Sequence, residues 1–196
     1  MGERLGILGG TFDPPHIGHL LLAYAAIEQL GLDGLLLLPA RRQPLKSEVE
    51  ITDPGHRLAM VRLVATSDPR LQVDPIEVER PGLSFTVDTL RTFRTARPEA
   101  TWHLILGADA ARTFGQWKEP EAIAGMARLV VCTRGDEAMP AAPSGIMWDR
   151  LATRRVDVSA TEIRARVRAG LPIRGFVTEA VASYIEAHAL YRTTTE

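Results

Sequence analysis

Residues 6–20 read GILGGTFDPPHIGHL, which is an apolar run, a glycine pair, a proline pair and then a segment with two histidines. The apolar run has the length of a strand, and residues 17–30 have helical character. We therefore interpret the stretch as a strand, a tight turn and a helix. Because glycine has no Cβ, Gly9 and Gly10 let the backbone turn sharply and approach a phosphate closely. The two prolines fix φ and stiffen the entry to the helix.

The same alternation of a strand-length run and a helical segment recurs along the chain. The expected strands are residues 6–8, 35–38, 73–78, 104–106, 129–132 and 155–158. The expected helices are residues 17–30, 55–66, 86–97, 108–114, 121–126, 160–169 and 178–188. Strands that alternate with helices indicate a parallel sheet with right-handed crossovers, so we predict a doubly wound α/β fold.

Length and composition favour one compact domain. The chain has 196 residues, and with 45% hydrophobic and 24% charged residues it is too apolar to be disordered. We expect a single domain over residues 1–196, in which residues 159–190 form the C-terminal helical part. Val177, Val181 and Ile185 are spaced as one apolar stripe that would dock the last helix on the domain.

The charge, the cysteine content and the first residues of the chain limit its partners, its disulfides and its location. Lys plus Arg number 23 against 24 for Asp plus Glu, so the net charge of −1 provides no overall attraction to nucleic acid or to a membrane. The single cysteine, Cys132, excludes a disulfide framework within the chain. The first ten residues are typical of neither a signal peptide nor a membrane-spanning helix, so we expect a cytoplasmic location. The sequence leaves the oligomeric state open.

The histidines of the opening segment are the first candidates for chemistry. His16 and His19 are three residues apart at the expected helix start, which places both imidazoles on one helix face beside the unsatisfied N–H groups of the helix end. Such an arrangement can bind an anion. A lone histidine is more often structural, and a histidine pair also suits a metal. No third His or Cys lies nearby in the sequence, which disfavours zinc.

A second polar motif, SATEIR, occupies residues 159–164. Ser159 and Glu162 have the spacing of a capping box, so a helix start alone could explain them. Capping does not account for Arg164, nor for Thr161 in the first turn. A guanidinium and a hydroxyl beside a helix N-terminus are groups that bind a polyphosphate. We therefore predict a helix start that is both capped and part of an anion site.

Both motifs point to a known family. The segment GGTFDPPHIGHL resembles the G-x-F-x-P-x-H-x-G-H signature of a nucleotidyltransferase superfamily, and SATEIR matches its Ser-x-Thr-x-x-Arg pattern. Residues 81–90, residues 106–117 and the closing sequence VASYIEAHALY are similar to bacterial nicotinate-nucleotide adenylyltransferases. The resemblance implies a Rossmann-like nucleotidyltransferase fold. It also implies an enzyme of NAD biosynthesis that transfers the adenylyl group of ATP to nicotinate mononucleotide, giving deamido-NAD and pyrophosphate.

The resemblance implies an ATP site at the two motifs. His16 and His19 would donate to the α-phosphate and to the transition state, and Arg164 would hold the β- and γ-phosphates. Mg²⁺ would bind with the ATP phosphates and water, without a dedicated protein site. The further residues that the resemblance assigns to ATP are Gly9, Gly10, Thr11, Phe12, Gly18, Gly107, Asp109, Ser159 and Thr161. Of these, Asp109 could equally be a helix cap.

The resemblance places the mononucleotide near Thr86, Trp117 and Lys118. The indole face would contact the pyridine ring, while the Thr86 hydroxyl and the backbone N–H of Lys118 can reach its carboxylate. Trp117 could instead be a half-buried packing residue. In the loop of residues 39–50, Lys46 would help to hold phosphates, although charged loops also serve solubility.

Departures from the family pattern leave alternatives open. Leu45 stands where the family commonly has histidine, and Phe85 where tyrosine is frequent. A phosphopantetheine adenylyltransferase and a cytidylyltransferase are the nearest alternative functions. A non-catalytic nucleotide sensor is the alternative from another class. The sequence does not distinguish nicotinate from nicotinamide mononucleotide as the acceptor.

Overall fold

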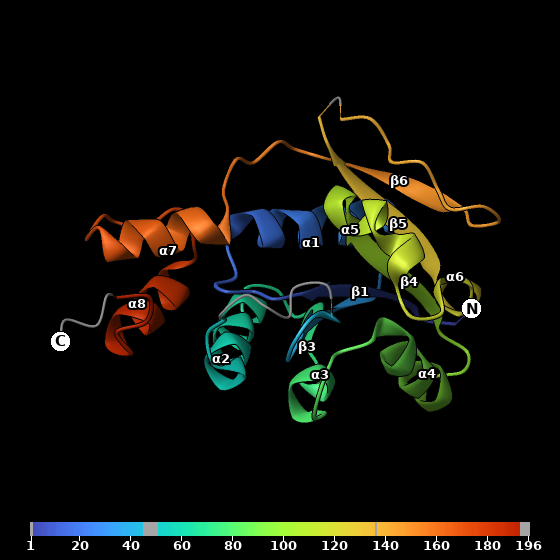
Figure 1. Ribbon diagram of the computed structural model, residues 1–196, viewed down its shortest axis with the longest axis horizontal. Helices are drawn as coiled ribbons and strands as arrows, with labels where there is room; N and C mark the ends of the chain where they lie inside the picture. Colours follow the sequence, from blue (N-terminus) through green and yellow to red (C-terminus); the bar gives the residue numbers. More distant parts are fainter. Residues whose placement is uncertain (1, 45–50, 136, 193–196) are drawn as a thin grey trace.

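The computed structural model describes residues 2–44, 51–135 and 137–192. Its centre is a parallel sheet with the strand order β3-β2-β1-β4-β5-β6 (Figure 1). The sheet is wound outward in both directions from β1, which confirms the doubly wound α/β fold predicted from the sequence. The strands are β1 (Arg4–Gly10), β2 (Gly34–Pro39), β3 (Leu71–Val73), β4 (Thr101–Gly107), β5 (Arg128–Arg134) and β6 (Trp148–Thr153).

Helices cover both faces of the sheet. Side chains from α1, α2, α7 and α8 form one core layer, and side chains from α4, α5 and α6 form the other. Successive strand residues alternate between the layers, since they point to opposite faces. The helices are α1 (Ile17–Leu30), α2 (Pro54–Ala65), α3 (Ile76–Glu79), α4 (Thr86–Ala96), α5 (Ala108–Arg112), α6 (Pro120–Met126), α7 (Ala160–Arg168) and α8 (Glu179–Ala187), with a 3₁₀ helix η2 (Phe114–Gln116).

The two C-terminal helices belong to the first core layer. α8 packs against α2 at one end of the molecule (Figure 1). The predicted stripe of Val177, Val181 and Ile185 is buried, which confirms its docking role. Hydroxyls of Ser159 and Thr178 cap α7 and α8. Within the described part of the chain, the structure contains no helix with the length and apolarity needed to cross a membrane.

The last strand differs from the prediction. The alternation at residues 155–158 predicts a strand, but this prediction is wrong, and the sixth strand is β6. β6 lies at the sheet edge and buries only Leu151, so it lacks the apolar run of a central strand. Val156 and Val158 are half-buried, and Val158 packs against the first core layer. The alternation therefore reflects an extended segment that lies on the core without joining the sheet.

The strand predicted at residues 73–78 is also wrong beyond its first residue. β3 ends at Val73, and the following residues form α3. Asp74 Oδ1 accepts the backbone N–H of Ile76 over 2.9 Å, which begins the helix. Pro75 has no N–H to donate to a strand ladder. These two residues end the strand although the apolar pattern continues.

Candidate active site

The carboxyl ends of β1 and β4 lie side by side where the strand order reverses. Leu8 is in register with Ile105, so Gly10 and Gly107, each two residues further on, lie at neighbouring strand ends. Ligands of doubly wound sheets bind in the crevice at such a point. Among the residues that the structure describes, and apart from the chain neighbours of each glycine, no atom lies within 4 Å of the position that a Cβ would take at Gly9 or Gly107. A ligand can therefore approach both strand ends closely, as predicted for ATP.

The turn after β1 is filled by the ring of Phe12. This residue is 3% exposed and has a left-handed backbone with φ 51°, a conformation that costs roughly 1–2 kcal/mol outside glycine. A Cβ at Gly10 would lie 3.1 Å from the Phe12 ring, so glycine leaves room for it. The ring meets His19 edge-on, with centroids 4.9 Å apart. Phe12 thus supports the histidine from inside, and any contact with ATP would come from its backbone.

His16 and His19 lie together at the start of α1. His16 is the N-cap residue, and its backbone N–H donates to Nδ1 of His19 over 3.1 Å. Because Nδ1 of His19 is an acceptor, the neutral ring carries its proton on Nε2. The two ring centroids are 3.8 Å apart, so the structure brings the predicted donors together.

Gly18 leaves room for the ring of His16. A Cβ at position 18 would lie 3.0 Å from both Cε1 and Nδ1 of His16, which is closer than side chains normally pack. The imidazole can therefore fold over the first turn of α1 because position 18 has no side chain. This contact is a physical reason for the glycine between the two histidines.

We expect Gly18→Ala to lower kcat about tenfold, because a small displacement of His16 spoils the alignment of a donor with the reacting phosphate. The fold should persist, since alanine is favoured over glycine in helices by up to about 1 kcal/mol. Steady-state kinetics and thermal unfolding of the same sample check both expectations. Gly125→Ala on α6 is the matched control, because in the described structure the added Cβ would meet no atom within 4 Å beyond its own helix backbone and chain neighbours. A normal kcat in Gly18→Ala would contradict this role.

Arg164 joins the second motif to the first. Its Nη1 donates to the backbone oxygen of Asp13 over 2.6 Å, across 151 positions of sequence. Its Nη2 donates to Thr161 Oγ1 over 3.3 Å. Ser159 Oγ caps α7 by accepting a backbone N–H over 3.1 Å, as the capping-box spacing predicts. The guanidinium therefore lies beside the turn that leads to His16, and the two motifs meet.

Asp13 is a site residue that the sequence reasoning missed. It is 5% exposed, and both carboxylate oxygens accept hydrogen bonds. Oδ1 accepts from the Tyr191 hydroxyl over 2.7 Å, and Oδ2 accepts from the Thr52 N–H over 3.1 Å. A buried carboxylate requires such partners. Its place inside the glycine and proline motif is the signal that could have identified it.

Arg57 on α2 is the second missed residue. It is fully buried, and burial lowers its pKa while the charge of Asp13 opposes this effect. The guanidinium thus ties the turn after β1 to the segment after β2. A charge on an otherwise apolar helix face is the sequence signal for such a role. Its nitrogens donate over 2.7–3.0 Å to the backbone oxygens of Thr11, Ala40, Arg41 and Thr52.

The remaining residues predicted for ATP lie around the same strand ends. Thr11 Oγ1 donates to Gln43 Oε1 over 3.2 Å. Gly107 is the N-cap residue of α5, and no side chain caps this helix. Asp109 is therefore not its cap, and its fully exposed carboxylate pairs with Arg112 over 2.5 Å. The contact of Asp109 with the adenosine side stays a prediction.

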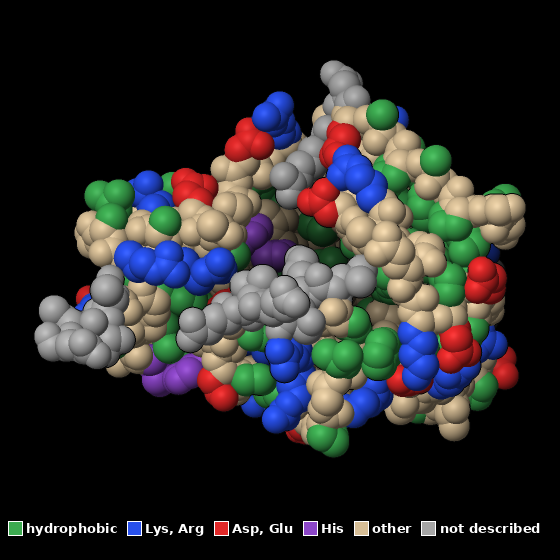
Figure 2. Space-filling view, viewed as in Figure 1, with side chains coloured by type: hydrophobic (Ala, Val, Ile, Leu, Met, Phe, Trp, Pro, Cys, Tyr) green, Lys and Arg blue, Asp and Glu red, His purple; other side chains and the backbone are tan. Residues whose placement is uncertain are grey.

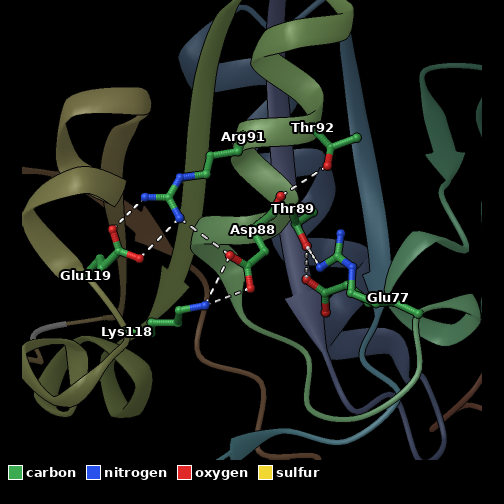
Figure 3. Close-up of polar contacts among 8 residues, drawn as sticks. Glu77, Asp88, Thr89, Arg91, Thr92, Lys118 and Glu119 are labelled. Atoms are coloured by element: carbon green, nitrogen blue, oxygen red, sulfur yellow. Dashed lines mark hydrogen bonds and ion pairs between the residues drawn. The ribbon is translucent and has the colours of Figure 1, made fainter.

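The residues predicted for the mononucleotide flank a polar network between α4 and the segment before α6 (Figure 3). Lys118 Nζ donates to both carboxylate oxygens of Asp88, over 3.1 and 3.3 Å. Arg91 donates to both carboxylate oxygens of Glu119. The network ties Lys118 to the helix that begins at Thr86. The ammonium of Lys118 is paired with Asp88. The predicted contact of Lys118 with a pyridine carboxylate would therefore be made by its backbone N–H.

Trp117 lies next to this network. It is half-buried, and its ring is tilted against Phe114 with centroids 5.2 Å apart. The packing interpretation of this tryptophan is thus confirmed, while its contact with a ligand stays a prediction. The predicted phosphate contact at Lys46 and the departure at Leu45 lie outside the described residues.

One face of the molecule is hollowed (Figure 2). Figure 2 shows histidine side chains at the bottom of a hollow in one face, with Lys and Arg side chains along one side of it. A separate groove of about 560 Å³ lies at the amino ends of β4, β5 and β6, and none of the predicted site residues that the structure describes lines it. The region where the two motifs meet is the candidate active site, because its imidazole, guanidinium and helix N–H groups suit phosphate.

Comparison with known proteins agrees with the class that the fold and the site define. The family model described as cytidylyltransferase-like matches residues 7–166, most of the chain. The protein is a nucleotidyltransferase of this class.

Curated relatives identify the family within this class. A protein of Gemmatimonas aurantiaca named "probable nicotinate-nucleotide adenylyltransferase" is 49% identical, over 96% of this chain and 92% of its own. A protein of Thermus thermophilus with the same name is 42% identical, over 96% and 100%. The chain belongs to the nicotinate-nucleotide adenylyltransferase family. The solved Plasmodium falciparum nicotinic acid mononucleotide adenylyltransferase complexed with NaAD shares the fold, with a TM-score of 0.77, 18% identity, and coverage of 96% of this chain and 97% of its own.

Proposed function

We propose that this chain transfers the adenylyl group of ATP to nicotinate mononucleotide, giving deamido-NAD and pyrophosphate. The observation that carries the proposal is the 2.6 Å hydrogen bond from Arg164 to the backbone oxygen of Asp13. This hydrogen bond puts the guanidinium of the second motif beside the turn that leads to His16 and His19. One triphosphate could therefore contact the guanidinium and the histidines together. The names of relatives at 39–49% identity support the identity of the acceptor.

The reaction joins a 5′-phosphate oxygen of the mononucleotide to the α-phosphorus of ATP and breaks the bond from that phosphorus to pyrophosphate. Negative charge grows on the oxygens around the α-phosphorus and on the leaving group, so positioned donors provide the catalysis. His19 would donate from Nε2, with His16 beside it and the N–H groups of α1 adding to the site. Arg164 would bind the β- and γ-phosphates. No covalent enzyme intermediate is required.

The donor groups suit an anionic ligand, and a metal ion would arrive with it. Each oxygen of the buried Asp13 carboxylate accepts a hydrogen bond, from the Tyr191 hydroxyl and from the Thr52 N–H. We expect Mg²⁺ to be held by phosphate oxygens of ATP and by water. When bound, the ion neutralises part of the triphosphate charge.

The acceptor would occupy the space beside α4 and Trp117. The indole would contact the pyridine ring, while the Thr86 hydroxyl and the backbone N–H of Lys118 would bind its carboxylate. The ion pairs of Lys118 with Asp88 and of Arg91 with Glu119 support this arrangement, because they fix the segment after Trp117 against α4.

Pyrophosphate release by the purified chain tests the proposal. With Mg-ATP and nicotinate mononucleotide, we expect pyrophosphate and a dinucleotide with the mass of deamido-NAD. Nicotinamide mononucleotide and phosphopantetheine as acceptors, and CTP in place of ATP, are assayed in parallel. Faster turnover with phosphopantetheine or with CTP would assign the chain to a related transferase. A lack of pyrophosphate with every acceptor would favour a nucleotide sensor.

We expect Arg164→Ala to raise the KM for ATP about 10- to 100-fold, the range for losing one hydrogen bond to a charged group. The KM for the mononucleotide should change little. Initial rates with each substrate varied in turn give both values. Arg168→Ala, one turn further along α7 and exposed, is the matched control. A rise in the mononucleotide KM alone would reverse our placement of the two substrates.

A further inference from the structure

We propose that Tyr191 is a positioning residue of the ATP site. It is the last residue of the closing sequence VASYIEAHALY, to which the roles above assign nothing. The proposal rests on the proposed function, since it assigns Tyr191 to the substrate that Arg164 would bind. It concerns a residue that need not touch ATP and acts through its neighbours.

The hydroxyl of Tyr191 holds the carboxylate of Asp13. It donates to Oδ1 over 2.7 Å, although 178 positions of sequence separate the two residues. Asp13 is 5% exposed, so its carboxylate depends on this bond and on the N–H of Thr52 in place of water. Burial, the charge of Asp13 and this hydrogen bond all raise the pKa of Tyr191, so the phenol keeps its proton and stays a donor.

Asp13 transmits this constraint to Arg164. Its backbone oxygen accepts from Nη1 of Arg164 over 2.6 Å, while its carboxylate is held at both oxygens. A side chain fixed at two points restricts the backbone that carries it. Tyr191, Asp13 and Arg164 therefore form one connected set, which links the end of the chain to the guanidinium predicted to hold the phosphates.

The backbone near Tyr191 is strained in a way that this role explains. Tyr191, which follows α8, has a left-handed φ of 63°, whereas the left-handed φ of 49° at Ala189 belongs to the Schellman cap that ends α8. This conformation is uncommon outside glycine and is unfavourable for a bulky residue. Such strain persists only where surrounding contacts hold it, and it concentrates at functional sites. Here the contacts are the bond to Asp13 and the packing of the Tyr191 ring on the first core layer.

Tyr191→Phe tests the proposal, because it removes the hydroxyl and keeps the ring. We expect the KM for ATP to rise about tenfold, with the KM for nicotinate mononucleotide within about twofold of the starting value. Tyr184→Phe is the matched control, since its hydroxyl lies 2.9 Å from Nδ1 of His56 and does not touch the site. It should leave both KM values unchanged. A Tyr191→Phe protein with a lower melting temperature but a normal KM for ATP would overturn the proposal.

A double-mutant cycle tests whether Tyr191 acts through Arg164. The cycle compares Tyr191→Phe, Arg164→Lys and the double variant. If the hydroxyl works by positioning the guanidinium, the double variant should bind ATP about as weakly as Arg164→Lys alone. Strictly additive losses would overturn the proposed route.

Two measurements separate this proposal from the proposed function. Calorimetric binding of an ATP analogue with a methylene between the α- and β-phosphorus reports on Tyr191→Phe even if the wild-type chain forms no dinucleotide. About tenfold weaker binding supports the proposal, and equal binding overturns it. Hydrogen exchange of the wild-type chain needs no variant. The analogue should slow exchange of the amides at residues 189–192, and protection confined to Gly9 and Gly10 would contradict the link.

Discussion

His19→Ala should lower kcat by roughly 10²- to 10³-fold, the usual loss on removing one donor to a transition state. The hydrogen bond from the His16 N–H to Nδ1 of His19 leaves Nε2 as the proton-bearing nitrogen, so the variant removes the donor that we propose acts on the growing charge. The KM values should change much less, because the lost interaction is made chiefly in the transition state. Steady-state and single-turnover rates of adenylyl transfer measure the effect.

His56→Ala is the matched control for this prediction. His56 is the third residue of α2, as His19 is of α1, and its Nδ1 lies 2.9 Å from the Tyr184 hydroxyl. It should retain wild-type kcat. Circular dichroism and thermal unfolding establish that both variants are folded. Near-normal turnover in folded His19→Ala would refute the role of this imidazole.

Arg57→Met should lower the free energy of unfolding by about 3–5 kcal/mol, the range for removing one partner of a buried charged interaction. Methionine fills much of the same volume but donates nothing. The four backbone oxygens that Arg57 binds would remain buried without their donor, and Asp13 would lose a nearby positive charge. Urea unfolding followed by fluorescence measures the change.

Arg62→Met is the control on the same helix. Arg62 is exposed, so its replacement should alter the free energy of unfolding by no more than about 0.5 kcal/mol. Arg57→Lys should recover only part of the loss, because an ammonium cannot reproduce the planar fork of a guanidinium. Equal urea midpoints for the wild type and Arg57→Met would show that the buried guanidinium does not brace the turn.

The fold was predictable from the sequence where strands are buried on both faces. Residues 34–39 are buried throughout, and such strands appear as continuous apolar runs. The prediction failed at the edges of the sheet. β6 buries Leu151 alone, and β3 stops at Asp74 and Pro75, so the apolar pattern does not mark where either strand lies. A strand at the edge of a sheet buries few side chains. Because apolar residues in the sequence mark buried positions, they do not mark such a strand.

The candidate site was predictable as far as local motifs extend. The glycines, the histidines and the motif that contains Arg164 each have a fixed spacing within a few residues, and this spacing indicates their chemistry. The residues that hold them in place lie far away in the sequence, at no fixed spacing from them. The bond from Tyr191 to Asp13 and the four bonds of Arg57 join segments that only the folded chain brings together. No pattern in the sequence alone indicates that these distant segments lie side by side.

The contact between Arg164 and Asp13 also bears on synthesis of the chain. The ribosome releases the glycine turn and both imidazoles early, but the guanidinium follows only with α7, after β6 has completed the sheet at Thr153. A product terminated between these two elements would contain all the strands of the described sheet and still lack the guanidinium proposed to hold the triphosphate. α7 must therefore be synthesised before the guanidinium proposed to hold the triphosphate can reach the turn after β1.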